Sequence, residues 1–579
     1  MGISISGHIG FARDIIGGNK GLDEETLLAA LEARGLLRTA ETAGLERRTI
    51  IMLAQRLKPD ERLNFDQAVT ELERAVQVAL DVIARGERGT NDHAFANTVL
   101  ARVAEQTRIG DLDGGTSTID QALAEFAATY RRQRVVLLEE GVKVDILRRD
   151  AAAVARRIEM IVAVAADHPD DRPAWHPQFH ERFVAFSVDG QRRGINISSE
   201  IASEMARCML RSARDNRERA LALNLVGHGM LELGRRGIGT KSLESAARSY
   251  RDALESQTRE AAPLEWAKYQ SNLGNALTAL AERDAGAEGF EEAIAAYRAV
   301  LQERSRARAP VDWAKTQLNL GNALRQLGER QTGSELLVCA ARAFRSALEV
   351  FTPTEYQEHW GTAQTGLGAA LLCQGERESG TVRLKEAAAA FGAALLVRTR
   401  EPTPHRWAHA QNGLATALKE RGQREHMPKL TQEAVAAYRE VLEVWTRDSA
   451  PVLWAGVQIN LGHALRDLGE DDPGTSHLQE AIEADRNALT TLTREEQGQQ
   501  WAKAQNGLGS ALLGWGKRET GTAHLKEAVK AFEAALEVWT PDGDPACYRQ
   551  ATSKLQAARQ HLRTREAKTD AARTRAKRG

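Results

Sequence analysis

The sequence predicts an all-α solenoid of antiparallel helix pairs, and three observations support this fold class. The chain has 579 residues, more than a single hydrophobic core usually serves, so several domains or a repeat array are expected. Its composition is 42% hydrophobic, 5% aromatic and 27% charged, a mixture typical of helices. A tryptophan also recurs every 47 residues without insertion or deletion, at Trp266, Trp313, Trp360, Trp407, Trp454 and Trp501.

Each tryptophan lies in the predicted first helix of a repeat. A leucine follows seven positions later, next to a glycine in all repeats except the one with Leu414 and Ala415. Proline stands three residues before the aromatic position in most repeats, where it suits the first turn of a helix: Pro263, Pro310, Pro404, Pro451 and Pro545. The same register reaches back to Arg219 and on to Tyr548, so the array is predicted to span residues 216–562.

A second helix is predicted after a glycine-containing break, such as Gly328 to Gly333. A hydroxyl residue precedes it in most repeats and suits an N-cap: Thr240, Ser334, Thr381, Thr475 and Thr522. Small and large apolar residues then recur on one helical face, as Ala293, Ala296 and Tyr297 do in one repeat. The repeat is therefore a helix–turn–helix unit.

This pattern resembles the tetratricopeptide repeat, which has Leu-Gly-x-x-Leu in its first helix, Ala-x-x-x-Tyr/Phe in its second and a proline before the next unit. The resemblance implies a right-handed α-solenoid that binds peptides on the face formed by its first helices. The family unit has ~34 residues, so we expect about seven additional residues between the two helices here. The glutamines at the family's aromatic site, such as Gln317, are a second departure.

Outside the array, residues 1–215 are predicted to be helical with degenerate repeat-like segments, such as the one around Phe65. Around residues 183–197, Asp189 and Gly190 suggest a turn, and a small β-hairpin is one interpretation. The segment 563–579 is rich in basic residues and poor in apolar ones, and we predict a disordered tail or a frayed helix extension there.

The bulk charge and the cysteines limit the partners. The formal net charge is -1, so the molecule has no overall field that attracts nucleic acid or an anionic membrane. The apolar stretches are too short to span a bilayer. The four cysteines lie far apart and form no CxxC motif, which favours a reducing, cytoplasmic location without zinc.

Two segments suggest other chemistry, and each has a structural interpretation. Residues 234–242 contain glycines before Lys241 and Ser242, but Thr240 breaks the Gly-Lys step of a phosphate loop, and the segment aligns with an interhelix turn. His168, His176, His180 and Glu181 do not form HExxH. We therefore expect no metal, no cofactor and no catalytic residues, and we expect the periodic tryptophans to be buried core anchors.

The candidate binding site is the face of the first helices. Asparagine amides there can pair with an extended backbone, and lysine and arginine can hold carboxylates, so a protein or peptide with an acidic segment is the expected partner. The alternative for this face is an ordinary solvated surface. The candidate residues are Lys268, Asn272, Asn275, Lys315, Asn319, Asn322, Arg325, His409, Asn412, Asn460, His463, Arg466, Lys503 and Asn506.

The sequence thus favours a non-enzymatic protein–protein interaction scaffold. The alternative is an enzyme or a nucleotide-dependent switch whose active part lies in residues 1–215, where a non-repeat pocket would favour it. The basic tail suggests contact with nucleic acid, but its few charges would give only salt-sensitive binding, and nucleic acid is not an expected partner.

Overall fold

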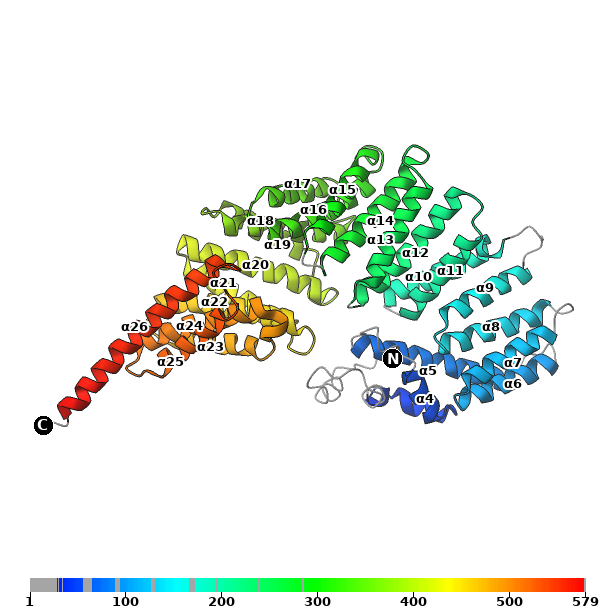
Figure 1. Cartoon of the computed structure of the whole chain (residues 1–579), viewed down its shortest axis with the longest axis horizontal. Coiled ribbons are helices and arrows are strands. Elements are labelled where there is room, and N and C mark those ends of the chain that lie inside the picture. Colours follow the sequence, from blue (N-terminus) through cyan, green and yellow to red (C-terminus); the bar gives the residue numbers. More distant parts are fainter. Residues whose placement is uncertain are drawn as a thin grey trace. The chain divides into compact units, whose positions relative to one another are not determined.

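The computed structural model describes residues 29, 31–33, 35–55, 65–88, 94–125, 131–165, 172–193, 196–237, 239–283 and 286–576. The chain divides into two compact units, unit 1 (Met1–Arg304) and unit 2 (Ser305–Gly579). All regular structure in the described residues is helical, as the sequence predicts, and Figure 1 labels the helices in chain order.

Unit 1 begins with helices that do not follow the 47-residue register. Consecutive helices of this part pack against one another, and α5 also contacts α8 (Figure 1). The helices are α3 (Leu36–Thr42), α4 (Arg47–Gln55), α5 (Phe65–Arg88), α6 (Ala94–Arg108), α7 (Leu112–Glu125), α8 (Arg131–Leu147), α9 (Ala151–Ala165), the 3₁₀ turn η1 (Pro173–Trp175), α10 (Pro177–Arg193) and α11 (Asn196–Arg211).

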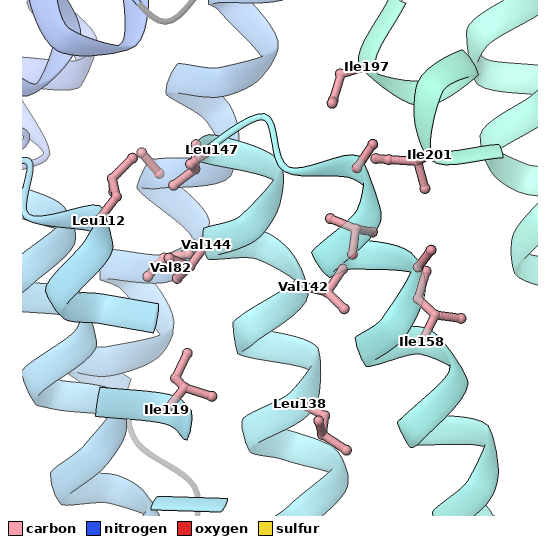
Figure 2. Packing of buried hydrophobic residues seen from close by; sticks show 14 of the residues in the cluster. Val82, Leu112, Ile119, Leu138, Val142, Val144, Leu147, Ile158, Ile197 and Ile201 are labelled. Carbon is pink, nitrogen blue, oxygen red and sulfur yellow. The ribbon is translucent and has the colours of Figure 1, made fainter. Parts of the chain in front are cut away.

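One apolar core joins these helices to the first repeat. Figure 2 shows part of it, with Ile119 of α7, Leu138 of α8 and Ile158 of α9 lying between neighbouring helices. The same core continues to Ala222 and Val226 on α12, the first helix of the array. Unit 1 then ends with two helix pairs, α12 (Asn216–Arg236) with α13 (Lys241–Ser256), and α14 (Pro263–Ala281) with α15 (Glu288–Glu303).

Unit 2 consists of further pairs and a long last helix. The first helices are α16 (Pro310–Arg330), α18 (Gln357–Arg377), α20 (Pro404–Glu425), α22 (Pro451–Asp471) and α24 (Arg494–Arg518). Their partners are α17 (Glu335–Leu348), α19 (Val382–Leu395), α21 (Pro428–Leu442), α23 (Ser476–Leu489) and α25 (Ala523–Leu536), and α26 (Pro545–Ala576) follows. Successive first helices of unit 2, including α24 and α26, contact one another and form a continuous layer.

The additional residues of the expanded repeat lengthen the first helix. We expected them between the two helices, but α16 has 21 residues and continues through Gly328 to Arg330. Gly328 is buried, and a Cβ there would lie 3.0 Å from Cδ2 of Leu337 on α17. Glycine at this position therefore permits close helix packing and does not end the helix.

The predicted N-cap hydroxyls stand at the predicted positions, but their side chains form no cap hydrogen bond. Ser334 and Thr381, for example, precede α17 and α19 with backbone angles close to the helical region. A side chain reaches the free N–H groups best from an extended N-cap residue. Asp215 and Thr493 have that conformation and accept from the N–H groups of Glu218 and Glu496.

An arginine near the end of the first helix joins successive repeats of unit 2. Arg424 donates to the carbonyl oxygens of Gly375 (2.7 Å) and Glu378 (2.6 Å), at the end of the preceding first helix and in its turn. The same contacts recur in register at Arg377, Arg518 and Arg565. Each arginine thus satisfies helix-end carbonyls that lack intrahelical partners.

Arg565 belongs to the segment that we expected to be either disordered or a frayed helix extension, and its residues 563–576 continue α26 as helix. Arg565 donates to the carbonyl of Gly516 (2.8 Å), and Glu566 pairs with Lys526 of α25 (3.3 Å). These contacts stabilise helix in a sequence whose only apolar residues are alanines.

The suggested β-hairpin at residues 183–197 is also wrong, because α10 runs through Asp189 and Gly190 to Arg193. Phe179 and Phe183, four residues apart, are buried on one face of that helix. Asp189 forms an ion pair with Arg74 and accepts a hydrogen bond from Ser198 (2.8 Å), so tertiary partners hold the residue that suggested a turn.

The periodic tryptophans are half-buried, so the expectation that they are fully buried anchors is wrong. Trp454 and Trp501 lie at the edge of a small apolar cluster, and Trp266 stacks on the guanidinium of Arg259. A register of fully buried rings lies on the second helices instead, in every repeat except the one with Asp485. Its members are Tyr250 and Tyr297 in unit 1, and Phe344, Phe391, Tyr438 and Phe532 in unit 2.

Candidate functional site

Two of the three candidate residues in unit 1 form hydrogen bonds with other side chains of the protein. Lys268 is exposed on α14. Asn272 donates to the side-chain oxygen of Asn224 (2.8 Å), and Asn275 accepts from the hydroxyl of Tyr297 (2.7 Å). These two asparagines therefore stabilise contacts between helices of unit 1.

The first candidates of unit 2 lie on α16. Lys315 is exposed, whereas Asn319 and Asn322 are half-buried. Arg325 forms an ion pair with Glu329 one turn later on the same helix. Lys315 therefore remains the most accessible of the four.

On α20, His409 packs edge-on against the buried ring of Trp445, with 4.7 Å between centroids. Asn412 is half-buried, and its Oδ1 atom is buried without a hydrogen-bond partner. Asn460 is half-buried on α22. A buried amide oxygen without a donor is costly, so Asn412 is a position where a bound group could add a hydrogen bond.

The structure brings the remaining candidates together around His463. Burial lowers the pKa of His463 well below its usual value, and four cations lower it further: Arg466, Lys419, Lys554 and Lys503. These five residues come from α20, α22, α24 and α26 of unit 2, and we call them the His463 cluster. His463 is neutral at physiological pH because burial disfavours its charged form and because a proton there would add to four positive charges.

The positive charges of the His463 cluster are only partly neutralised. Lys419 pairs with Glu420 (2.6 Å) and Arg466 pairs with Asp467 (3.0 Å). Among the described residues, neither Lys503 nor Lys554 forms an ion pair. Burial lowers the pKa of Lys554 to about 8, and this ammonium group donates a hydrogen bond to the neutral hydroxyl of Ser510.

Asp485 lies next to the cluster and interrupts the register of buried aromatic residues. Tyr438 and Phe532, one repeat before and after it, fill the same position on their second helices. A Cβ on Gly462 or Gly507 would lie 3.0 or 2.8 Å from Oδ1 of Asp485, so the carboxyl group lies between two first helices. Burial raises its pKa well above the usual value, and Arg466 opposes this only in part.

Two buried acceptors therefore lie beside the cluster without donors. Oδ1 of Asp485 and Oδ1 of Asn506 have no hydrogen-bond partner in the described part of the chain, and both residues are more than nine-tenths buried. Buried polar atoms in folded proteins are normally paired. This part of unit 2 thus combines unpaired hydrogen-bonding atoms with two ammonium groups that form no ion pair among the described residues. Carboxylates act on these groups only at longer range, Glu470 and Asp467 on Lys554 and Glu376 on Lys503.

Lys419, Lys554 and Asp485 were not among the site residues predicted from the sequence. Asp485 was visible in principle as the polar residue in the register of Tyr438 and Phe532. Lys554 lies one repeat after Gly507, and continuing the register through Tyr548 would have found it. Lys419 stands one repeat before Arg466, which was identified.

The other segments with suggestive chemistry have structural roles or fall outside the description. Gly234 lies within α12 and Lys241 begins α13, so Lys241 follows an interhelix turn and no strand precedes it. His180 stacks on Phe183, and no group of three or more potential metal ligands occurs among the described residues. His168 lies outside the described residues.

Within residues 1–215, the buried ionisable groups are arranged as ion pairs. Asp145 accepts from Arg157 (2.6 Å), and Glu71 pairs with Arg149 (2.9 Å). Glu140 is almost fully buried, and burial raises its pKa to about 6 against the opposing charges of Lys143 and Arg85. Such networks are also common in structural cores, and they do not by themselves indicate catalysis.

No helix in the described part of the chain has both the length and the apolar character needed to cross a lipid bilayer.

Comparison with known proteins gives no sequence relative. No family model matches the chain, and no curated protein matches it. Among solved structures, yeast Tom70 is 12% identical with a TM-score of 0.30, covering 83% of this chain and 99% of that one. The P58(IPK) TPR domain is 13% identical with a TM-score of 0.22, covering 74% and 99%. A circular tandem repeat protein with novel repeat topology is 16% identical with a TM-score of 0.21, covering 91% and 99%.

Proposed function

We propose that this protein is a non-enzymatic interaction scaffold and that the first helices of unit 2 bind an acidic segment of a protein partner. The observation that carries the proposal is the pair of ammonium groups, Lys503 and Lys554, that form no ion pair among the described residues of unit 2. They lie with Arg466 around a neutral His463. The four unpaired cysteine thiols fit a reducing, cytoplasmic setting.

The physical basis is that a carboxylate of the partner would stabilise the charged form of Lys554, which burial disfavours. A partly buried ammonium group is poorly hydrated, and an opposite charge next to it interacts more strongly than it would in water. The effect is screened less by salt than that of an exposed pair. An acidic segment therefore gains affinity at this position.

The hydrogen-bonding groups beside the charges suit an extended chain. Asn412 and Asn506 occupy the same register position on α20 and α24, and each has a side-chain oxygen without a donor. Backbone N–H groups of a bound peptide are suitable donors. The exposed Lys315, together with His409 and Asn460, would extend the same first-helix surface in unit 2.

Fluorescence polarisation with a labelled glutamate-rich peptide, and with its glutamine-rich counterpart as the uncharged probe, tests this proposal. The glutamate peptide is expected to bind more tightly, and Lys503→Glu combined with Lys554→Gln is expected to weaken it by roughly tenfold or more. Lys530→Glu is the matched control because Lys530 is exposed on a second helix, α25.

Thermal unfolding of the same variants separates binding from folding. The double variant is expected to unfold at or above the temperature of the unchanged protein, because it removes an unpaired, partly buried charge. Equal binding of the two peptides, or unchanged glutamate-peptide binding by the double variant, would rule out this surface.

A further inference from the structure

A second polar residue of unit 2 interrupts an otherwise apolar register, at a place separate from the His463 cluster. In unit 2, one residue just beyond each second helix recurs every 47 positions and is almost fully buried in four of the repeats, as Phe351, Trp445, Leu492 and Trp539; in unit 1 the same position holds Gln257 and Arg304. At the corresponding position after α19 stands Arg398, with only 8% of its surface exposed. A guanidinium group thus replaces an apolar side chain.

The hydrogen bonds of Arg398 go to neutral groups. Its Nη1 donates to Oγ1 of Thr365 (2.7 Å) and its Nη2 to Oγ1 of Thr362 (2.9 Å), both on α18. The two hydroxyls donate in turn to carbonyl oxygens of their own helix, those of Gly361 (2.8 Å) and Glu358 (2.7 Å). The threonines therefore hold the guanidinium in place and supply no negative charge.

No counter-charge for Arg398 occurs among the described residues of unit 2. Burial alone lowers its pKa, with no carboxylate contributing, and its Nε atom has no hydrogen-bond partner. A guanidinium has five N–H donors, so three remain after the bonds to the threonines. A buried cation without an anion is unfavourable unless something else pairs with it.

Gly361 gives a second, independent indication that this position is built to hold the arginine. The corresponding residue of the other first helices in unit 2 is a fully buried alanine: Ala314, Ala408, Ala455 and Ala502. A Cβ on Gly361 would lie 3.0 Å from Nε of Arg398, tighter than ordinary contact. Arginine at position 398 and glycine at position 361 therefore occur in the same repeat, and the absence of a methyl group on Gly361 leaves room for the guanidinium.

We propose that Arg398, oriented by Thr362 and Thr365, is a binding site for an oxyanion group, a carboxylate or a phosphate. The planar fork of a guanidinium matches both groups, which can each accept two parallel hydrogen bonds. The imidazole of His409 lies near enough for Arg398 to lower its pKa, after the larger effect of burial. Arg398, Thr362 and Thr365 are not among the residues of the proposed peptide-binding surface, so this site does not depend on the proposed function.

The test uses inorganic phosphate and acetate as probes, added to the full-length protein at constant ionic strength with chloride as the reference anion. Calorimetric titration is expected to show binding of at least one probe, and the probe that binds identifies the source of the oxyanion. Arg398→Leu is expected to lower the affinity by tenfold or more and should fold, since Leu492 fills the same position in another repeat.

Two further variants distinguish binding from structure. Arg400→Gln is the matched control, because Arg400 follows the same helix but is exposed and paired with Glu443 (2.6 Å); it should leave the affinity unchanged. Gly361→Ala should fold, as the sibling alanines do, but should weaken anion binding by crowding Nε. The thermal stability of Arg398→Leu in chloride should equal or exceed that of the unchanged protein.

Several outcomes would overturn the site. These are binding of neither probe, equal binding by Arg398→Leu, or a marked loss of stability in Arg398→Leu in chloride, which would assign Arg398 a purely structural role through its threonine bonds.

Discussion

The ammonium group of Lys554 donates a 3.0 Å hydrogen bond to the hydroxyl of Ser510, which joins the last helix of unit 2 to α24. Ser510 in turn donates to the carbonyl oxygen of Asn506 (2.7 Å). This chain of contacts holds a partly buried positive charge next to His463 and Arg466. The charge state of Lys554 is therefore coupled to the charge of the whole His463 cluster.

The first prediction concerns the pH dependence of acidic-peptide binding. Because the pKa of Lys554 is about 8, its charge is present below that pH and is lost as the pH rises through it. Affinity for the glutamate-rich peptide should fall between roughly pH 7 and 9, whereas an ordinary lysine stays charged to about pH 10. Polarisation titrations across this range measure the effect. Lys554→Arg should flatten the profile, and a flat profile in the unchanged protein would contradict the prediction.

The second prediction concerns Asp485 and stability. Its pKa is raised on folding, so its contribution to stability is full below about pH 4 and is lost as the pH rises through the folded-state value. Asp485→Asn removes this dependence. The variant should unfold at a higher temperature than the unchanged protein near pH 7, and the difference should shrink towards pH 4.

Calorimetry at several pH values checks this difference directly. Asp472→Asn is a suitable control, since Asp472 is a carboxylate of the same unit whose pKa is lowered by the N–H of Gly474 and by His477. Asp472→Asn should lower the unfolding temperature at neutral pH, whereas Asp485→Asn should raise it. A loss of stability in Asp485→Asn at pH 7 would show that the buried carboxylate is paired after all.

The third prediction concerns the arginines that join successive repeats. Arg424→Ala removes the donors to the carbonyls of Gly375 and Glu378, and should cost about 1.5–3 kcal/mol. Arg439→Ala, which breaks an exposed ion pair with Glu480, should cost only ~0–1 kcal/mol. Denaturant titration of both variants provides the comparison, and similar costs would argue against a special role for the interrepeat arginines.

The fourth prediction compares the two aromatic registers. Phe344 is fully buried and lies against Gly321, whereas Trp360 is half-buried. Phe344→Ala should therefore cost ~3–5 kcal/mol, and Trp360→Ala clearly less, although tryptophan is the larger residue. Chemical unfolding of the two variants measures the difference. The reverse order would restore the tryptophans as core anchors.

Much of the architecture could be predicted because it repeats. The prolines that begin α14, α16, α20 and α22 stand where the register places them, and the second helices carry the expected small and aromatic residues. Local details were less predictable. Gly328 has the sequence context of a helix end, yet it lies inside α16 because Leu337 of the next helix needs the space.

The candidate site was predictable only in part. His463, Arg466, Lys503 and Asn506 were identified from their place on the first helices, but the sequence did not reveal which candidates are already engaged. Asn272 and Asn275 bond to Asn224 and Tyr297, and Arg325 pairs with Glu329. Such partners depend on side-chain directions that a register does not specify.

The sequence by itself determined the repeated helix pair, because the 47-residue period, the prolines and the apolar spacing are properties of neighbouring residues. Tertiary structure alone decided that Lys554 and Lys419 lie with His463 next to unpaired acceptors, and that Arg398 has no counter-charge among the described residues of unit 2. Burial and charge pairing depend on residues that folding brings together from different repeats, and the cost of leaving them unpaired appears only when water is excluded.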